Sequence, residues 1–151
     1  MATRSGFVVF MRKARLQLNN GSFAFLTISD IPDNAAEIDE AYAYSLSVVA
    51  ELINSINPLD YDRAVYNLGL HDMAVNSGLP VFESTATAAN KKSGRGFVNS
   101  TSDEGTSTSI TLPDYLIKQS PYMMELDKTQ FGRAYLAILS RYNLLATFYV
   151  G

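Results

Sequence analysis

The 151-residue sequence contains no cysteine and only one histidine, and these absences exclude much chemistry. Without cysteine the chain can form no disulfide, no thiolate nucleophile and no cysteine-ligated zinc site. The lone histidine, His71, could hold a metal ion only if several carboxylates met at one point. We therefore expect no metal and no cofactor. We interpret His71 as a hydrogen-bonded structural residue, and an enzyme that uses it as a base is the poorest alternative.

Other catalytic signatures are also missing. No Gly-x-Ser-x-Gly segment is present to expose a nucleophilic serine. The glycine-containing segment 91–96 is basic, but it leads into a predicted strand and not into the helix that a phosphate cradle requires. The acidic pair Asp103 and Glu104 lies on a turn, where adjacent side chains point apart, whereas a catalytic carboxylate pair must face each other. We predict that the protein is not an enzyme.

Charge is sparse, and long apolar runs are absent. Twelve Lys and Arg residues against fifteen Asp and Glu residues give a net charge of −3, which lacks the basic footprint of a nucleic-acid-binding protein. Residues 1–18 combine a short apolar run with internal basic residues, so they predict neither a signal peptide nor a membrane span. We expect an intracellular protein without membrane contact. The generous aromatic content fits either a surface covered by partners or an aromatic core.

The length predicts one domain over residues 1–151, and a hydrophobic content of 47% excludes global disorder. Apolar periodicity and helix-end signals predict helices over about 6–18, 35–56, 60–77 and 127–145, with a weaker one over 81–92. The first of these is expected to begin at a Ser5 cap and to keep Arg12, Lys13 and Arg15 in water. A rival interpretation replaces its end with a hairpin that turns at Asn20-Gly21. Residues 22–28 are left open.

The two central helices carry the clearest signals. Asn34 and Glu37 have the spacing of a capping box, and Asn57-Pro58 should end the helix that follows. This helix should present a continuous apolar stripe, formed by Ile38, Tyr42, Leu46, Val49, Ile53 and Ile56. The next helix, closed by Gly78, is apolar on more than one side. We therefore expect it to be central in the fold or to be covered by a neighbouring subunit.

The second half of the chain predicts an arm and an apolar end. Strand-like segments at 97–101 and 106–112 flank an Asp-Glu-Gly turn and are rich in Ser and Thr. Nothing in them is suited to catalysis, so we interpret this hairpin as an assembly element. The last eight residues, 144–151, are apolar and aromatic without a charge, unlike the polar termini of most soluble monomers. We expect this tail to be buried, in the chain's own core or in another chain.

Five segments, taken in order, resemble the head–tail connector, or adaptor, proteins of tailed bacteriophages. They are Gly6 to Arg12, Ala64 to Leu68, Gly96-Phe97-Val98, Ser102 to Ser107 with closure at Leu112-Pro113, and Lys128 to Leu136. The stretch Thr129-Gln130-Phe131-Gly132 in the last predicted helix is the most recognisable part. The resemblance implies a mainly α fold: a small helical bundle with a protruding β-hairpin arm at about 96–113 and an extended C-terminal tail at about 144–151.

The resemblance also implies a function. Such proteins form a ring, typically twelvefold, beneath the portal and above the next tail component, and DNA passes through it without sequence-specific contact. The expected location is the virion neck, after synthesis in the bacterial host cytoplasm. The expected partners are copies of the same chain, the portal protein, a downstream tail or nozzle protein and the passing DNA.

Two sets of contact residues follow from this resemblance, and a third follows from the basic character of the loop 91–96. The portal interface is expected at Phe131, Tyr135, Tyr142, Phe148, Tyr149 and Val150; the contact with a neighbouring subunit or the tail is expected at Phe97, Val98, Asp103, Glu104, Ile110 and Leu112. Lys91, Lys92 and Arg95 are candidates for contact with DNA or an acidic partner. The alternative function is a small nucleic-acid-binding regulator that uses these three residues with Arg12, Lys13 and Arg15. The acidic balance of the chain argues against it.

Overall fold

The computed structural model describes residues 1–18, 20–84, 100–103, 106–109 and 121–145. Its helices are α1 (Arg4–Lys13), α2 (Ala36–Val48), α3 (Glu51–Ile56), α4 (Pro58–Asn76), α7 (Pro121–Leu126) and α8 (Gln130–Arg141), with a 3-10 turn η1 at Pro80–Ser84. Two antiparallel hairpins pair β1 (Arg15–Gln17) with β2 (Phe23–Phe25) and β3 (Ser100–Asp103) with β4 (Thr106–Ser109). The predicted mainly α fold with a β-hairpin is confirmed. The predicted tail lies outside the described residues beyond Leu145.

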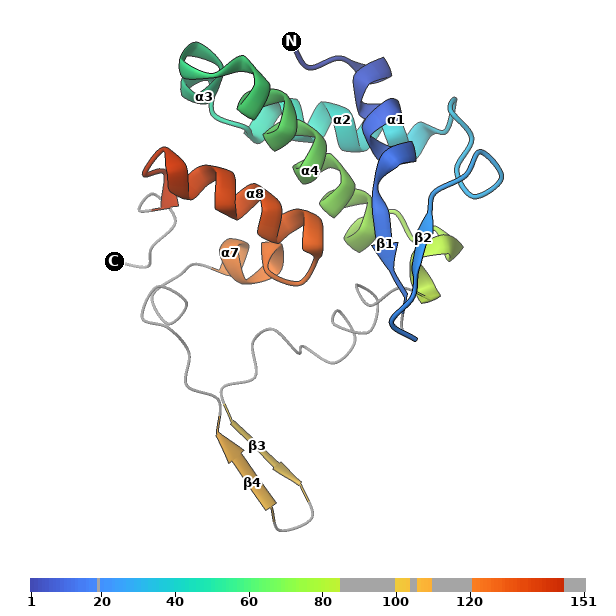
Figure 1. Cartoon of the computed structure of the whole chain (residues 1–151), viewed down its shortest axis with the longest axis vertical. Coiled ribbons are helices and arrows are strands. Elements are labelled where there is room, and N and C mark those ends of the chain that lie inside the picture. Colours follow the sequence, from blue (N-terminus) through green and yellow to red (C-terminus); the bar gives the residue numbers. More distant parts are fainter. Residues whose placement is uncertain (19, 85–99, 104–105, 110–120, 146–151) are drawn as a thin grey trace.

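Helix α4 is the centre of the fold, as its two-sided apolar pattern predicts. It packs against α1, α2, α3 and α8, and Figure 1 shows it crossing the helical body between α2 and α8. Its start is fixed by the Asn57 side chain, which accepts hydrogen bonds from the backbone N–H groups of Leu59 and Asp60, with Pro58 as the first helical residue. Gly78, at φ +70°, follows its end.

The core consists of two clusters along α4. The first joins α1, α2 and the second half of α4, and its fully buried members include Phe7, Met11, Ile38, Leu70 and Met73. The second joins α3, α8 and the first half of α4, and includes Ile53, Val65, Leu68, Tyr135 and Leu139. Both sides of α4 are therefore covered by the chain itself. The suggestion that this helix needs a neighbouring subunit to cover it is wrong.

The N-terminal helix is shorter than predicted. It begins after Thr3, whose hydroxyl accepts the Gly6 N–H at 2.9 Å, so Ser5 is not the cap. It ends at Lys13, because the next residues pair as β1 with β2 and thereby bury Leu16. A helix reaching residue 18 is therefore wrong, and the rival hairpin is right for residues 15–25, with Gly21 at φ +86° in its turn.

The long helix predicted over residues 35–56 is broken in two. Val49 and Ala50 have extended backbone conformation between α2 and α3. After the bend α3 packs against α4, and Val49 and Ile53 are both buried in the second cluster. The stripe is therefore not continuous, since Leu46 is 39% and Ile56 is 60% exposed. The capping box is also wrong, because Ala35 occupies the N-cap position and no side chain caps α2.

Candidate functional site: a buried histidine and three exposed surfaces

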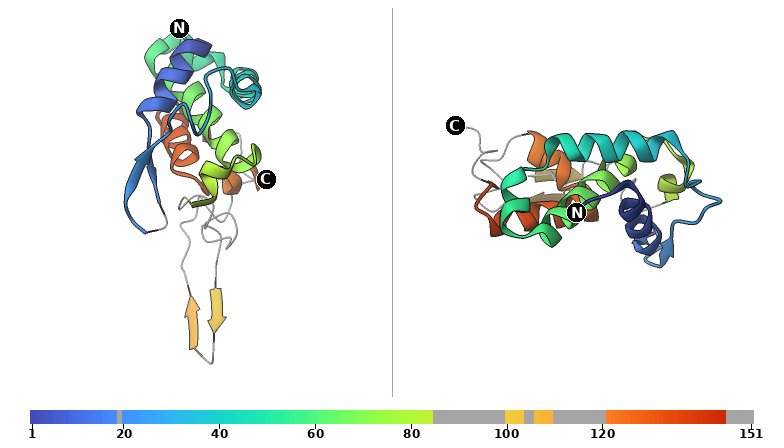
Figure 2. Two further views of the ribbon diagram at one scale, coloured as in Figure 1. Left: turned by 90° about the vertical axis from the view of Figure 1, so that its right-hand side faces the viewer. Right: turned by 90° about the horizontal axis from the view of Figure 1, so that it is seen from above.

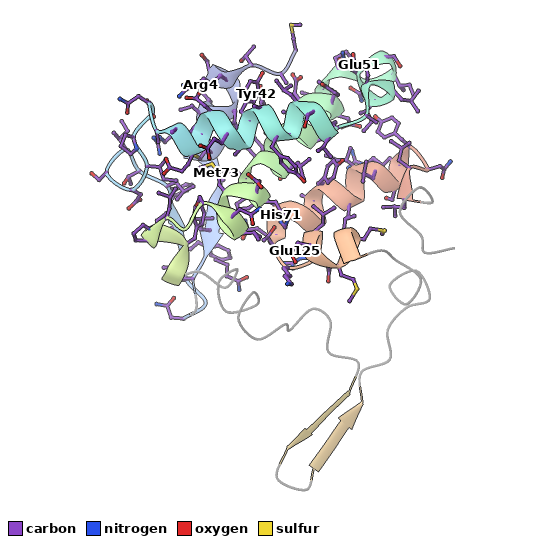
Figure 3. All side chains as sticks on the ribbon, turned by 180° about the vertical axis from the view of Figure 1, so that it is seen from behind. Arg4, Tyr42, Glu51, His71, Met73 and Glu125 are labelled. Atoms are coloured by element: carbon purple, nitrogen blue, oxygen red, sulfur yellow. The ribbon has the colours of Figure 1, made fainter. Side chains whose placement is uncertain are left out.

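His71 is a structural residue, as predicted. It lies on α4, is 5% exposed, and its Nδ1 is 2.7 Å from Thr129 Oγ1. The pKa of His71 is lowered to about 4, mainly by burial, with Glu125 raising it and Lys128 lowering it to a smaller extent. Figure 3 shows His71 beside Glu125, where α4 meets α7. The imidazole is therefore neutral near pH 7.

Thr129 connects this histidine to the start of α8. Its side chain is fully buried and accepts the Gly132 N–H at 2.8 Å, which caps the helix. The hydroxyl hydrogen remains to be donated to Nδ1 of His71, so we assign the imidazole proton to Nε2. A Cβ at residue 132 would lie 1.8 Å from the Leu126 carbonyl oxygen and 2.9 Å from His71 Nδ1. The Thr-x-x-Gly motif is thus explained by capping and close packing, a role the sequence alone did not reveal.

Two predicted portal contacts belong to the core instead. Phe131 is 4% and Tyr135 is 1% exposed, both on the face of α8 that packs against α4. Assigning their side chains to an exposed interface is therefore a mistake: the apolar face of α8 is used inside the subunit. The remaining aromatic prediction in the described chain, Tyr142, follows α8 and is partly exposed. Phe148, Tyr149 and Val150 lie outside the described residues.

Tyr142 belongs to a charged cluster around Asp60. Its hydroxyl donates to Asp60 Oδ2 at 2.7 Å, Arg141 Nη1 lies 3.3 Å from Oδ1, and Arg63 Nη1 lies 3.7 Å from Oδ1. The Tyr142 hydrogen bond and the Arg141 charge hold the pKa of Asp60 below its ordinary value although burial opposes this. The cluster ties the start of α4 to the end of α8.

A half-open groove lies on the outer side of α7 and α8. Its volume is about 380 Å³, its surface is mostly apolar, and it is lined by Met123, Asp127, Arg133, Leu136, Ala137, Ser140 and Leu145. Arg133 and Ala137 are exposed, whereas Met123 closes the floor. The prediction that the last helix meets a partner therefore fits its outer side and not the Phe131–Tyr135 side.

The predicted arm is a two-stranded hairpin. Asp103 pairs with Thr106 at its end, and within the described residues neither strand pairs with a third strand. Figure 1 and the left view of Figure 2 show β3 and β4 projecting away from the helices. The other predicted arm contacts, Phe97, Val98, Glu104, Ile110 and Leu112, lie outside the described residues.

The basic residues of the alternative function are only partly available. The Arg12 guanidinium donates to the backbone oxygens of Leu26, Thr27 and Ile31 and to the Asp33 carboxylate. The expectation that it stays in water is wrong, because it holds the loop after β2 in place. Lys13 and Arg15 are exposed, as predicted. Lys91, Lys92 and Arg95 lie outside the described residues.

An exposed pair of aromatic side chains on β2 was not predicted from the sequence. Phe23 and Phe25 are 53% and 56% exposed on β2, and Ile28 beyond them is 64% exposed. The alternation Phe23-Ala24-Phe25 was the available signal, because it puts both rings on one face of a strand. Within the described ranges no group of three or more His, Asp or Glu residues is arranged to hold a metal ion. No helix in that part of the chain has both the length and the apolar character needed to cross a bilayer.

No family model, curated protein or solved structure matches this chain.

Proposed function

We propose that this protein is a non-enzymatic structural subunit of a phage neck. Copies of it form an oligomeric adaptor ring, the twelvefold ring that the resemblance implies, which joins the portal to the tail and lets DNA pass. Its place is the virion neck, and its partners are copies of itself, the portal protein and a downstream tail protein. The ordered segments that resemble phage connectors support this proposal, and so do two surfaces of the described structure.

The β3–β4 hairpin is the observation that carries the proposal. An isolated two-stranded hairpin is marginally stable in water. The described strands contain only Ser, Thr and Asp, so they offer no apolar side chain to pack against the helices. An arm of this kind gains stability when its free backbone edges pair with another chain. This favours a protein that is completed by assembly.

The groove between α7 and α8 supports the second half of the proposal, the portal contact. A mostly apolar groove of about 380 Å³ with Arg133 and Asp127 at its lining has the mixed character of a protein-binding site. It also adjoins Leu145, from which the apolar tail 146–151 continues. Outer groove and tail together are our candidate portal contact.

The charge of the chain fits DNA passage. A net charge of −3 repels phosphate, so DNA can move past the ring without being retained. The alternative function, a nucleic-acid-binding regulator, is less favoured because the Arg12 guanidinium is hydrogen-bonded within the chain, to the Thr27 carbonyl oxygen and the Asp33 carboxylate.

The portal contact can be tested by capture. The full chain is mixed with the portal protein encoded in the same genome, and bound protein is measured by pull-down. We expect the wild type to be captured and Ala137→Arg, which fills the groove from an exposed position, to be captured at least about tenfold less, a loss of roughly 1.4 kcal/mol.

Ser55→Arg, an equally exposed helix position on α3, is the matched control and should be captured like the wild type. Removing residues 148–151 should also weaken capture. A wild type that never binds the portal would overturn the proposed function. Undiminished capture of Ala137→Arg and of the truncated chain would remove the groove and the tail from it.

A further inference from the structure

The β1–β2 hairpin has one face in the core and one face in solvent. In its register Leu16 pairs with Ala24, and Leu16 is 2% exposed. The neighbouring pairs Arg15–Phe25 and Gln17–Phe23 lie on the opposite face of the ribbon because strand side chains alternate. The Gln130 side chain of α8 donates to the Arg15 carbonyl oxygen at 2.6 Å, which fixes the ribbon to the body. The outward face is therefore a rigid surface.

This outward face, which we call the ribbon face, is aromatic and cationic. Phe23 and Phe25 are more than half exposed, and the Arg15 guanidinium lies 4.5 Å from the centroid of the Phe23 ring. Lys13 is exposed just before β1. Neither cation forms an ion pair within the described part of the chain. The face thus offers two aromatic rings beside uncompensated positive charge.

The outer side of α2 has the complementary character. Glu37 and Glu40 of α2 and Asp72 of α4 line one small groove of about 50 Å³, and no Lys or Arg is among the described residues that line it. Tyr44, four residues after Glu40 and therefore on the same side of α2, is 36% exposed. We call this surface the α2 face. Like charges this close repel one another mildly, and an incoming cation would relieve that repulsion.

The two faces point in opposite directions. In the left view of Figure 2 the ribbon lies at one side of the molecule and α2 at the other, and Figure 3 looks onto α2 from behind. They therefore cannot meet within one chain. They differ in chemistry as well, so a contact between them joins unlike surfaces of two copies.

We propose that the ribbon face of one copy docks on the α2 face of the next copy. Phe23 and Phe25 cover the exposed Tyr44 ring, while Arg15 reaches the carboxylates. A contact between unlike faces repeats from copy to copy and closes into a ring when the rotation permits. This inference rests on the proposed function and names the surface through which the ring forms.

Charge favours a second copy over DNA as the occupant. Duplex binding is supported by several phosphate contacts, whereas the ribbon face supplies only Arg15 and Lys13. The α2 face supplies the opposite charge on the same molecule.

The test is the mass of the full chain in solution, measured by light scattering over a range of concentrations. We expect concentration-dependent oligomers for the wild type. Arg15→Glu and Glu40→Arg should each weaken self-association at least about tenfold, because each puts like charges opposite one another. The double variant Arg15→Glu/Glu40→Arg should regain most of it. Ser55→Glu, which adds a charge at an exposed position of α3 away from both faces, is the control and should assemble like the wild type.

All four variants should keep the wild-type circular dichroism spectrum, since the three positions they change are on the surface. A wild type that stays monomeric at every concentration, alone and with the portal, would overturn the contact. Loss in Arg15→Glu without loss in Glu40→Arg would also overturn it, in favour of a ribbon-to-ribbon dimer. Tight, salt-sensitive binding of duplex DNA that Arg15→Glu abolishes, without self-association, would assign the face to DNA.

The two proposals fail separately. A protein captured by the portal but monomeric in all conditions would remove this contact and leave the neck function. A protein that associates through these faces but is never captured by the portal would remove the neck function and leave this contact.

Discussion

His71 should make the protein lose stability as the pH falls from about 6.5 to 4. Its pKa is lowered from 6.5 to about 4 by burial between α4 and the start of α8. Between these pH values the His71 imidazole therefore binds a proton in the unfolded chain but not in the folded chain. The stabilisation is complete above the unfolded pKa and disappears as the pH approaches the folded pKa. Each pH unit between the two pKa values is worth about 1.4 kcal/mol, so the loss is about 3 kcal/mol.

The matched variant is His71→Asn. Its side-chain oxygen can take the place of Nδ1 and accept the Thr129 hydroxyl hydrogen, but it does not titrate in this range. Urea unfolding followed by far-ultraviolet circular dichroism at several pH values gives the free energy of unfolding for both proteins. The wild type should lose about 3 kcal/mol more than His71→Asn between pH 7 and pH 4. Carboxylates such as Asp127, whose pKa burial raises, titrate in both proteins and cancel in the difference.

A second measurement, an NMR titration, gives the pKa of His71 directly. The chain has one histidine, so one imidazole signal in a proton NMR titration reports its pKa without assignment. We expect a midpoint near 4 in the folded protein. A midpoint near 6.5, or identical pH slopes for the wild type and His71→Asn, would refute the reasoning that the imidazole is buried and neutral.

Three further predictions concern the contacts that hold the helices together. Gly132→Ala should destabilise the fold by about 1–3 kcal/mol, because its Cβ would overlap the Leu126 carbonyl; urea unfolding measures this, with Ser140→Ala at an exposed position of α8 as control. Arg12→Lys should cost about 1–3 kcal/mol and speed amide exchange in residues 26–33, since lysine cannot make the forked hydrogen bonds; unchanged exchange would contradict this. Asp60→Asn should be less stable than the wild type at pH 7, and this difference in unfolding free energy should disappear as the pH falls below about 3.8. The reason is that the lowered pKa of Asp60 contributes stability only while the carboxyl group is charged. A difference that does not change with pH would count against the Tyr142 and Arg141 contacts.

Signals that act over a few residues predicted their structures well. Asn57-Pro58 ends α3 at Ile56 and Gly78 follows the end of α4, because proline and positive φ act on adjacent residues only. The start of α4 at Pro58 is two residues earlier than predicted, since Asn57 also caps this helix. The β3–β4 hairpin follows from its turn for the same reason. His71 was correctly interpreted as structural because no second ligand residue of its kind exists in the chain.

Predictions were wrong where the structure depends on residues that are distant in the sequence. The break at Val49 and Ala50 depends on packing against α4, and the end of α1 at Lys13 depends on pairing between β1 and β2. Arg12 was expected in water, yet its bonds are to a loop 14 to 21 residues away in the chain. None of these partners is marked by residues next to the position concerned.

The sequence by itself determined that α4 is the central helix: apolar periodicity over α4 requires burial on several sides, whichever segments supply it. Only the tertiary structure decided which segments cover α4. Because α1, α2, α3 and α8 cover α4 within one chain, Phe131 and Tyr135 face inward. The surfaces left for a partner are therefore the ones that periodicity did not single out: the outer groove of α8, the ribbon face and the α2 face. Burial depends on where the other helices lie in space, and local patterns do not contain that position.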